Sequence, residues 1–338
     1  MRPVLALSLL ASVALAQDGP WKNDLSLWES KDGLRFQRVG VFVERGGVPS
    51  LARVGKGRLV SVFQWFPFDH EEAFDRVGVR ISEDDGETWS EPEAIRVKGL
   101  PESYERPYDP TLVPLEDGRV RVYFTSRDME GDNEQATYSA VSGDGVAYEF
   151  EPGKRFGVAG ERVIDCACCL HEGSFYYYSP VQGHDGKGYH AVSKDGLRFE
   201  RRDDVSVDGR RPWLGCVVST DEGMRFYGTG EGGWTATSKD GATWKLSERT
   251  RTDGCDPGVA QTEDGRWLMV STGPRNQDAT AEPPFDTRPK GSAPVEEGPP
   301  GGPASIASDG EKLYVVRGDW LYELDPLTLK VLRKVKVK

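Results

Sequence analysis

The sequence lacks three features that would assign it to common classes of protein. Beyond its first residues it has no apolar run long enough to cross a membrane. Acidic residues outnumber basic ones by 55 to 43, so the net charge is −12 and the chain has no excess of positive charge. Because nucleic-acid binding depends on a basic surface, this balance argues against a nucleic-acid partner. Helical periodicity is also missing, which predicts an all-β fold.

The one long apolar run stands at the start of the chain. Arg2 precedes the run from Val4 to Ala14, and the residues that follow end in the small-x-small pattern Ala14-Leu15-Ala16. This order is typical of a cleaved export signal. We therefore expect residues 1–16 to be a signal peptide and the mature protein to be secreted or periplasmic, with no membrane span.

The closing turn of a repeated unit is the sharpest motif in the chain. Ser82-Glu-Asp84-Asp-Gly86-Glu-Thr88-Trp89 matches a full Asp-box, and shorter copies contain Asp32, Asp144, Asp195 and Asp240. Successive copies are 52, 60, 51 and 45 residues apart. In such a turn the carboxylate accepts backbone amides, glycine supplies a left-handed residue, and the aromatic side chain packs between sheets.

Each unit also contains a hairpin with alternating apolar residues and an Asp-Gly or Glu-Gly turn. Four-stranded units repeated radially predict a five- or six-bladed β-propeller of four-stranded blades with Asp-box turns. We expect residues 17–273 to form it, with the N-terminal strands closing the ring. Residues 274–303 are rich in proline and glycine and predict a loop or linker. Residues 304–338 predict four strands, either a sixth blade or an appended sheet.

These motifs resemble the sialidase-like superfamily with bacterial-neuraminidase repeats, over essentially the whole mature chain. The phrase from Asp109 to Val113, followed by Asp117-Gly-Arg-Val-Arg-Val-Tyr, also resembles five-bladed arabinanase- and fructosidase-type glycoside hydrolases. The tail from Tyr314 to Asp325 resembles a blade of quinoprotein-like propellers. The resemblances imply a propeller that acts on or binds a glycan.

Topology predicts which face carries the ligand site. In a four-stranded meander, the starts of inner strands and the ends of second strands lie opposite the closing turns. We expect the catalytic carboxylates there, because sugar cleavage needs one carboxylic acid and one carboxylate. The predicted catalytic residues are Asp109, Asp165, Glu231 and Asp256. The predicted substrate-binding residues are Arg127, Arg275, Trp65, His70 and Trp213. An aspartate before proline can also merely cap a turn, and that reading stays open.

One departure from the resemblance concerns sialidase activity itself. Sialidases carry an Arg-Ile-Pro motif whose arginine binds the substrate carboxylate. The corresponding phrase here is Gly47-Val48-Pro49, with glycine in place of the arginine. Glycine cannot replace a bidentate guanidinium, which argues against true sialidase activity.

Five cysteines follow the predicted cleavage site, an odd number for an oxidising compartment. Several fall near the starts of inner strands, which converge on the propeller axis. A copper or zinc site is one reading, since thiolate and imidazole suit these metals. Two disulfides with a spare thiol, or small buried side chains at a crowded axis, are the others. The candidate ligands are Cys166, Cys168, Cys169, His171, Cys216 and Cys255.

Three functions therefore remain open from the sequence. The first is a glycoside hydrolase, or a related glycan-acting enzyme, that uses axial carboxylates. The second is a non-catalytic propeller that binds a glycan, another small polar ligand or a protein. The third is a metal-binding propeller with a cysteine cluster.

Overall fold

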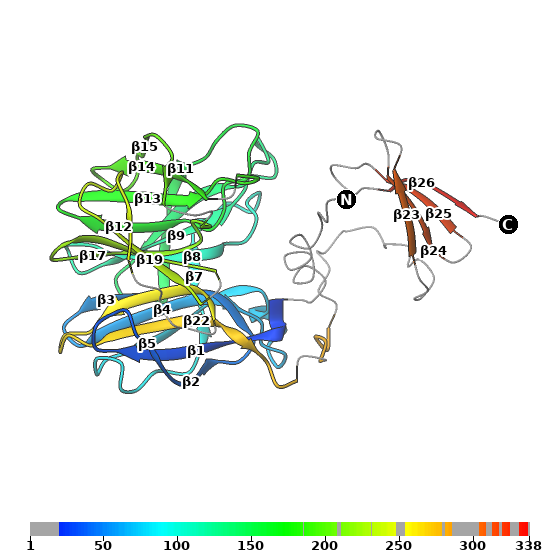
Figure 1. Ribbon diagram of the computed structural model, residues 1–338. Coiled ribbons are helices and arrows are strands. Elements are labelled where there is room, and N and C mark those ends of the chain that lie inside the picture. Colours follow the sequence, from blue (N-terminus) through cyan, green and yellow to red (C-terminus); the bar gives the residue numbers. More distant parts are fainter. Residues whose placement is uncertain are drawn as a thin grey trace, which may run out of the picture. The chain divides into compact units, whose positions relative to one another are not determined.

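The structure is a computed structural model and is shown in Figure 1. It describes residues 20–184, 186–207, 211–230, 232–247, 254–278 and 281–285, and the four strands within 304–336. The chain divides into two compact units, Met1–Pro284 and Phe285–Lys338. In the first unit, five antiparallel sheets form the blades of a β-propeller, which confirms the predicted fold class.

The five innermost strands surround the axis. Each lies against the next, and the last lies against the first, so the ring is closed. In blades 1 to 5 these strands are β3 (Gly46–Gly55), β8 (Tyr108–Pro114), β12 (Ala167–His171), β17 (Gly215–Thr220) and β21 (Cys255–Gln261). The second strands are β4 (Arg58–Trp65), β9 (Val120–Ser126), β13 (Ser174–Pro180), β18 (Gly223–Gly228) and β22 (Trp267–Arg275).

The third and fourth strands complete the blades. The third strands are β5 (Arg76–Ser82), β10 (Ala136–Ser142), β14 (Lys187–Ser193), β19 (Trp234–Ser238) and β1 (Asn23–Ser30). The outermost strands are β6 (Glu93–Ala94), β11 (Ala147–Phe156), β15 (Glu200–Arg201), β20 (Lys245–Leu246) and β2 (Gln37–Val43). Blade 5 thus joins the two ends of this unit, and Figure 1 shows blue β1 beside yellow β22.

Two short strands add to this pattern. β7 (Arg96–Lys98) leaves blade 1 and pairs in parallel with β11 of blade 2, and β16 (Val205–Ser206) pairs with β14. The second unit contains an antiparallel meander of β23 (Ala304–Ser308), β24 (Leu313–Arg317), β25 (Trp320–Leu324) and β26 (Val331–Lys336). The predicted signal peptide lies outside the described residues.

Apolar side chains fill the spaces between neighbouring blades. Val62 of blade 1 and Phe124 of blade 2 belong to one fully buried cluster. Trp213 and Phe226 belong to another, which joins blades 3 and 4. Both faces of each inner hairpin are therefore covered, and that is why β4 is buried along nearly its whole length.

The Ser-x-Asp turns that close the third strands share one set of hydrogen bonds. In blade 4, the Ser238 hydroxyl donates to Asp240 Oδ1 at 3.0 Å. The same oxygen accepts the amides of Ala242 at 2.9 Å and Thr243 at 2.7 Å. These bonds stabilise the ionised carboxylate, and the Thr243 amide is the main cause that lowers the pKa of Asp240 to about 2.

The turns also connect neighbouring blades. A side chain from the second strand of one blade, or from the residue before it, donates to a turn carbonyl of the next blade, all the way around the ring. The pairs are Arg58 with Asp144, Arg121 with Asp195, Tyr178 with Gly241, Arg225 with Asp32, and Arg266 with Asp85. The turns therefore fasten the ring together on the face away from the inner-strand starts.

We expect Asp240→Ala to lower the free energy of unfolding by about 1–2 kcal/mol at pH 7, because two amides and one hydroxyl lose their acceptor. Urea unfolding measures the change. Asp240→Asn keeps an acceptor oxygen and serves as the matched control, with a smaller loss. Since the folded-state pKa is depressed, the advantage of wild type over Asp240→Asn is present above pH 3.8 and disappears as the pH falls to about 2. An unchanged difference at pH 2 would contradict this explanation.

Candidate functional site

Five residues at one register position surround the axis where the inner strands begin. They are Val48, Asp109, Asp165, Leu214 and Asp256, one from each blade. Together with the residues that follow them, they line an axial pocket of about 20 Å³, enough for one water molecule. Three of the predicted catalytic aspartates therefore meet at one point, although at least 56 residues separate each from the next.

A common backbone conformation puts these residues at the axis. Val48, Asp109, Asp165 and Asp256 have φ of 46°, 48°, 55° and 49°, in the left-handed region. In three of the blades this position coincides with a register shift between the inner and second strands. Aspartate tolerates the left-handed region better than most residues, so the turn-capping reading explains part of the pattern. It does not explain why the carboxyls converge.

The carboxyls of Asp109 and Asp165 are in hydrogen-bonding contact. Withdrawal from water raises the pKa of Asp109 to about 6; Asp256 adds to the rise, while Thr125, Arg162 and the Asp165 amide oppose it. Burial, followed by the charges of Asp109 and Asp256, raises the pKa of Asp165 well above its usual range. Two carboxyls in contact share a proton, because both cannot ionise cheaply at this separation.

Asp256 is held from the neighbouring blade. The Thr229 hydroxyl donates to its Oδ1 at 3.1 Å, and the Asp256 amide donates back to Thr229 Oγ1 at 2.8 Å. The Cys255 thiol lies 3.6 Å from Oδ2. Burial raises the pKa of Asp256, and both hydrogen bonds oppose the rise by stabilising the ionised form.

A larger lateral pocket of about 350 Å³ lies beside the axial one. Val48 and Asp109 line both pockets. The other lining side chains are mostly polar or aromatic: Gln64, Phe66, Asp75, Glu105, Arg106, Tyr108 and Gln135. Arg106 is ion-paired with Asp75, so that this pair leaves little net charge in the pocket.

The predicted substrate-binding residues are distributed differently. Trp65 and Trp213 are 8% and 0% exposed and pack in apolar clusters, so neither presents a ring face to a ligand. Arg127 lies on the expected face, ion-paired with Glu105 at 2.9 Å. His70 is exposed in the loop after β4, 3.6 Å from Asp69. Arg275 ends β22 on the same face, and Glu231 lies outside the described residues.

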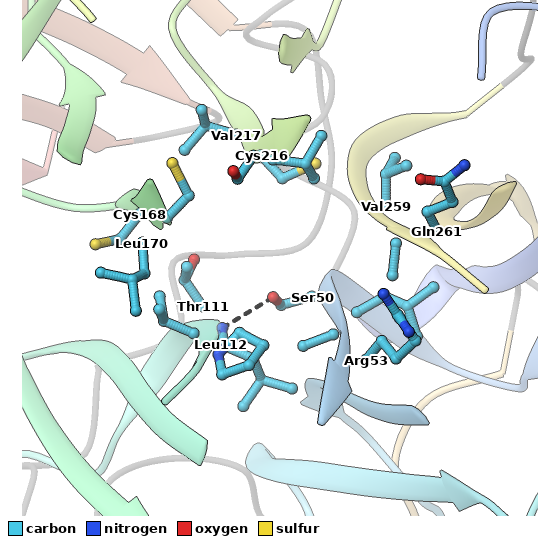
Figure 2. Close-up of a pocket in the computed structure, with 18 residues that line it drawn as sticks. Ser50, Arg53, Thr111, Leu112, Cys168, Leu170, Cys216, Val217, Val259 and Gln261 are labelled. Carbon is cyan, nitrogen blue, oxygen red and sulfur yellow. Dashed lines mark hydrogen bonds between the residues drawn. The ribbon is translucent and has the colours of Figure 1, made fainter. Parts of the chain in front are cut away.

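Three of the five cysteines lie deeper along the axis. Cys168, Cys169 and Cys216 line a cavity of about 270 Å³ that all five inner strands surround (Figure 2). Ser50 and Thr111 border both this cavity and the axial pocket, and Ser50 Oγ accepts the Leu112 amide at 3.0 Å.

A copper or zinc site at the cysteine cluster stays a prediction. Within the described residues, no three His, Cys, Asp or Glu side chains are grouped so that they could hold a metal ion. All five thiols are free, which also leaves the two-disulfide alternative without support. Burial raises the pKa of Cys166 and Cys216 to about 12, so both thiols are neutral at pH 7 when no metal is bound. His171 instead contacts Ser219, with Nδ1 2.9 Å from Oγ.

Sequence reasoning missed Arg162 and Gln135. The Arg162 guanidinium donates to Gln135 Oε1 at 2.5 Å, and the Val163 amide donates to the Gln135 carbonyl at 3.2 Å. These bonds hold Arg162 near the carboxyls, where its charge lowers the pKa of Asp109 and Asp165. Arg162 stands three residues before Asp165 in a loop, and that proximity is the one signal that could have identified it.

Since its folded-state pKa is raised, Asp109 stabilises the fold below its unfolded value near 3.9, and this contribution is lost as the pH rises to about 6. We therefore expect Asp109→Asn to melt a few degrees higher than wild type at pH 7. The gain should vanish at pH 4. Thermal unfolding at both values tests this, and a variant less stable than wild type at pH 7 would contradict it.

Comparisons with known proteins give structural similarities alone. No family model matches the chain, and no curated protein matches it. A thermostable family-43 glycoside hydrolase is similar at 13% identity and a TM-score of 0.49, over 67% of this chain and 88% of that one. CoXyl43, a β-xylosidase/α-arabinofuranosidase from a compost microbial metagenome, has 14% identity and a TM-score of 0.49, over 71% and 96%. An N-acetylgalactosamine deacetylase from F. plautii has 14% identity and a TM-score of 0.48, over 71% and 76%.

These identities and TM-scores are too low to indicate an activity for this chain. The sialidase resemblance stays a prediction. Helical structure in the described part of the chain amounts to two three-residue turns, Pro20–Lys22 and Glu71–Ala73, neither of which could span a membrane.

Proposed function

We propose that this protein is a glycan-acting hydrolase whose acid–base chemistry is carried out by Asp109, Asp165 and Asp256. One observation carries the proposal. Three aspartates from three blades converge on one small pocket, and the pKa of each is raised. Clusters of carboxyls with raised pKa are typical of sites that must offer a protonated acid beside an ionised base.

The roles follow from the contacts. Asp109 and Asp165 share a proton and form the acid unit, which donates that proton to the glycosidic oxygen as the bond between this oxygen and the sugar carbon breaks. Asp256 is the base. Its carboxylate accepts hydrogen bonds from Thr229 and Cys255, which favour its ionised form against burial, and it removes a proton from the water that attacks the sugar carbon. The sum is hydrolysis of one glycosidic bond.

The lateral pocket supplies room for the sugar. Its volume of about 350 Å³ suits one or two sugar rings, and it reaches Asp109 directly. Amide, carboxylate and guanidinium groups on Gln64, Asp75 and Arg106 offer hydrogen bonds to sugar hydroxyls. Because Asp75 neutralises Arg106, we propose a neutral sugar in this pocket rather than an acidic one.

Hydrolysis of a panel of neutral aryl glycosides tests the proposal. We expect turnover by the wild type and its loss in Asp109→Asn, Asp165→Asn and Asp256→Asn. Asp117→Asn is the matched control, because Asp117 is an exposed carboxylate in the β8–β9 turn, at the other end of the inner strand. Turnover that survives all three site substitutions would end the proposal. Sugar binding without any turnover would instead favour the non-catalytic glycan-binding propeller.

A further inference from the structure

Val48 adopts a backbone conformation that valine rarely tolerates. Its φ is 46°, in the left-handed region. Of the non-glycine residues with positive φ in the described part of the chain, six are aspartate or asparagine, and Val48 is the one that is β-branched. A β-branched residue in this region is a steric outlier. Pro49 restricts the conformation of Val48 further.

The surrounding structure holds Val48 in place. The Val48 amide donates to Thr272 Oγ1 of blade 5 at 3.1 Å, and the pairing of β3 with β4 shifts register between Gly47 and Ser50. The same shift occurs where Asp109 occupies this position in blade 2. The backbone at position 48 therefore has to adopt the left-handed conformation, and asparagine or aspartate would adopt it with less strain than valine.

Val48 lies at the position where the axial and lateral pockets adjoin. Val48 and Asp109 are the two residues common to the axial and lateral pockets. A ligand in the lateral pocket can therefore contact both Val48 and Asp109. Strained backbone conformations cluster at functional sites, where the surrounding structure holds them in place.

We propose that Val48 is a specificity-determining residue of this site. Its isopropyl group contacts the apolar C–H face of the sugar that reaches Asp109, at a backbone conformation that costs stability. This inference rests on the proposed function. A carboxylate at this position, like those of blades 2, 3 and 5, would add a fourth carboxyl group to the axial pocket and hydrate the ring face instead.

The Val48→Asn variant tests the backbone strain and the sugar contact separately. We expect Val48→Asn to melt roughly 2–4 °C above wild type, since it tolerates the left-handed conformation. We also expect kcat/KM on the preferred aryl glycoside to fall about tenfold or more, mainly through KM, because the lost contact is present in the bound substrate. Val48→Ile keeps both the branched side chain and the strain, and it should match wild type in melting temperature.

Glu172→Asn is the matched control for strain. Glu172 has φ of 47° in the exposed two-residue turn between β12 and β13, at the far end of an inner strand from Asp165. Asparagine before glycine is favoured in such a turn. The melting temperature of this variant should rise by a similar amount, and its activity should be unchanged.

Two results would overturn the proposal: a Val48→Asn protein no more stable than wild type, or one that is equally active. The melting temperatures need no substrate. If the wild type showed no turnover, the proposed hydrolysis would be wrong, but the melting temperatures would still test the strain at Val48. The contact is then tested by the shift in melting temperature that neutral monosaccharides cause, which Val48→Asn should lose and Val48→Ile should keep.

Discussion

Replacing Asp165 by asparagine is expected to lower kcat about 10³-fold, the range in which loss of a positioned general acid falls. The pKa of Asp165 is raised well above its usual range by burial and by the charges of Asp109 and Asp256, so this site favours the protonated form of Asp165. An asparagine amide fills almost the same space but has no proton to transfer. Steady-state kinetics on the preferred aryl glycoside measures the loss.

Leaving-group dependence distinguishes the acid role from a structural one. Glycosides with acidic phenol leaving groups need little protonation, so Asp165→Asn should hydrolyse them with a much smaller loss than it shows for alkyl glycosides. Asp117→Asn should show wild-type rates on both classes. An equal loss on both classes, with KM unchanged, would contradict the assignment of Asp165 to the acid unit.

Replacing Arg121 by methionine is expected to lower the free energy of unfolding by about 3–5 kcal/mol, because it leaves a half-buried carboxylate without its partner. Arg121 and Glu151 form a two-pronged pair at 2.8 Å and 2.8 Å, with side chains 7% and 18% exposed. Arg121 also donates to the Asp195 carbonyl of the next blade at 3.1 Å. The substitution therefore removes both an ion pair and one fastening of the ring.

Arg119 provides the matched control for Arg121. It stands two residues away and pairs with Asp117 at 2.7 Å, but both side chains are more than half exposed. Exposed pairs contribute little, since water and salt screen them, so Arg119→Met should leave unfolding unchanged. Equal losses in the two variants, measured by urea unfolding, would contradict the claim that burial and the Asp195 contact make Arg121 important.

Much of the fold could be predicted because its turns repeat. A Ser-x-Asp turn has local chemistry, and five copies at regular intervals identified the blades and the face opposite the site. β7 could not be predicted in this way. It is three residues long, and its parallel pairing with β11 depends on where the two blades lie in space. The tail strands gave no signal to distinguish a sixth blade from an appended sheet.

The site was predictable only where its residues have distinctive chemistry. Asp109, Asp165 and Asp256 stand at strand starts, and the topology brings strand starts together. Val48 occupies the same position in blade 1, but an apolar residue before a strand carries no chemical signal. Trp65 and Trp213 show the opposite problem: an aromatic residue suits a sugar platform and an interior cluster equally well, and burial decides between them. The spacing of the cysteines likewise contained no information on whether their sulfurs converge.

Titration of the aspartate carboxyls by carbon-13 NMR detects proton sharing at the axial pocket without any substrate. We expect at least two carboxyl resonances to titrate above pH 5, with coupled transitions, and Asp109→Asn or Asp165→Asn to abolish the coupling. Asp32, Asp84 and Asp240 of the Ser-x-Asp turns should titrate near pH 2 in the same spectra. If every aspartate instead titrated below pH 4.5, the three carboxyls would not form a proton-sharing site, and the proposed acid–base chemistry would have no basis.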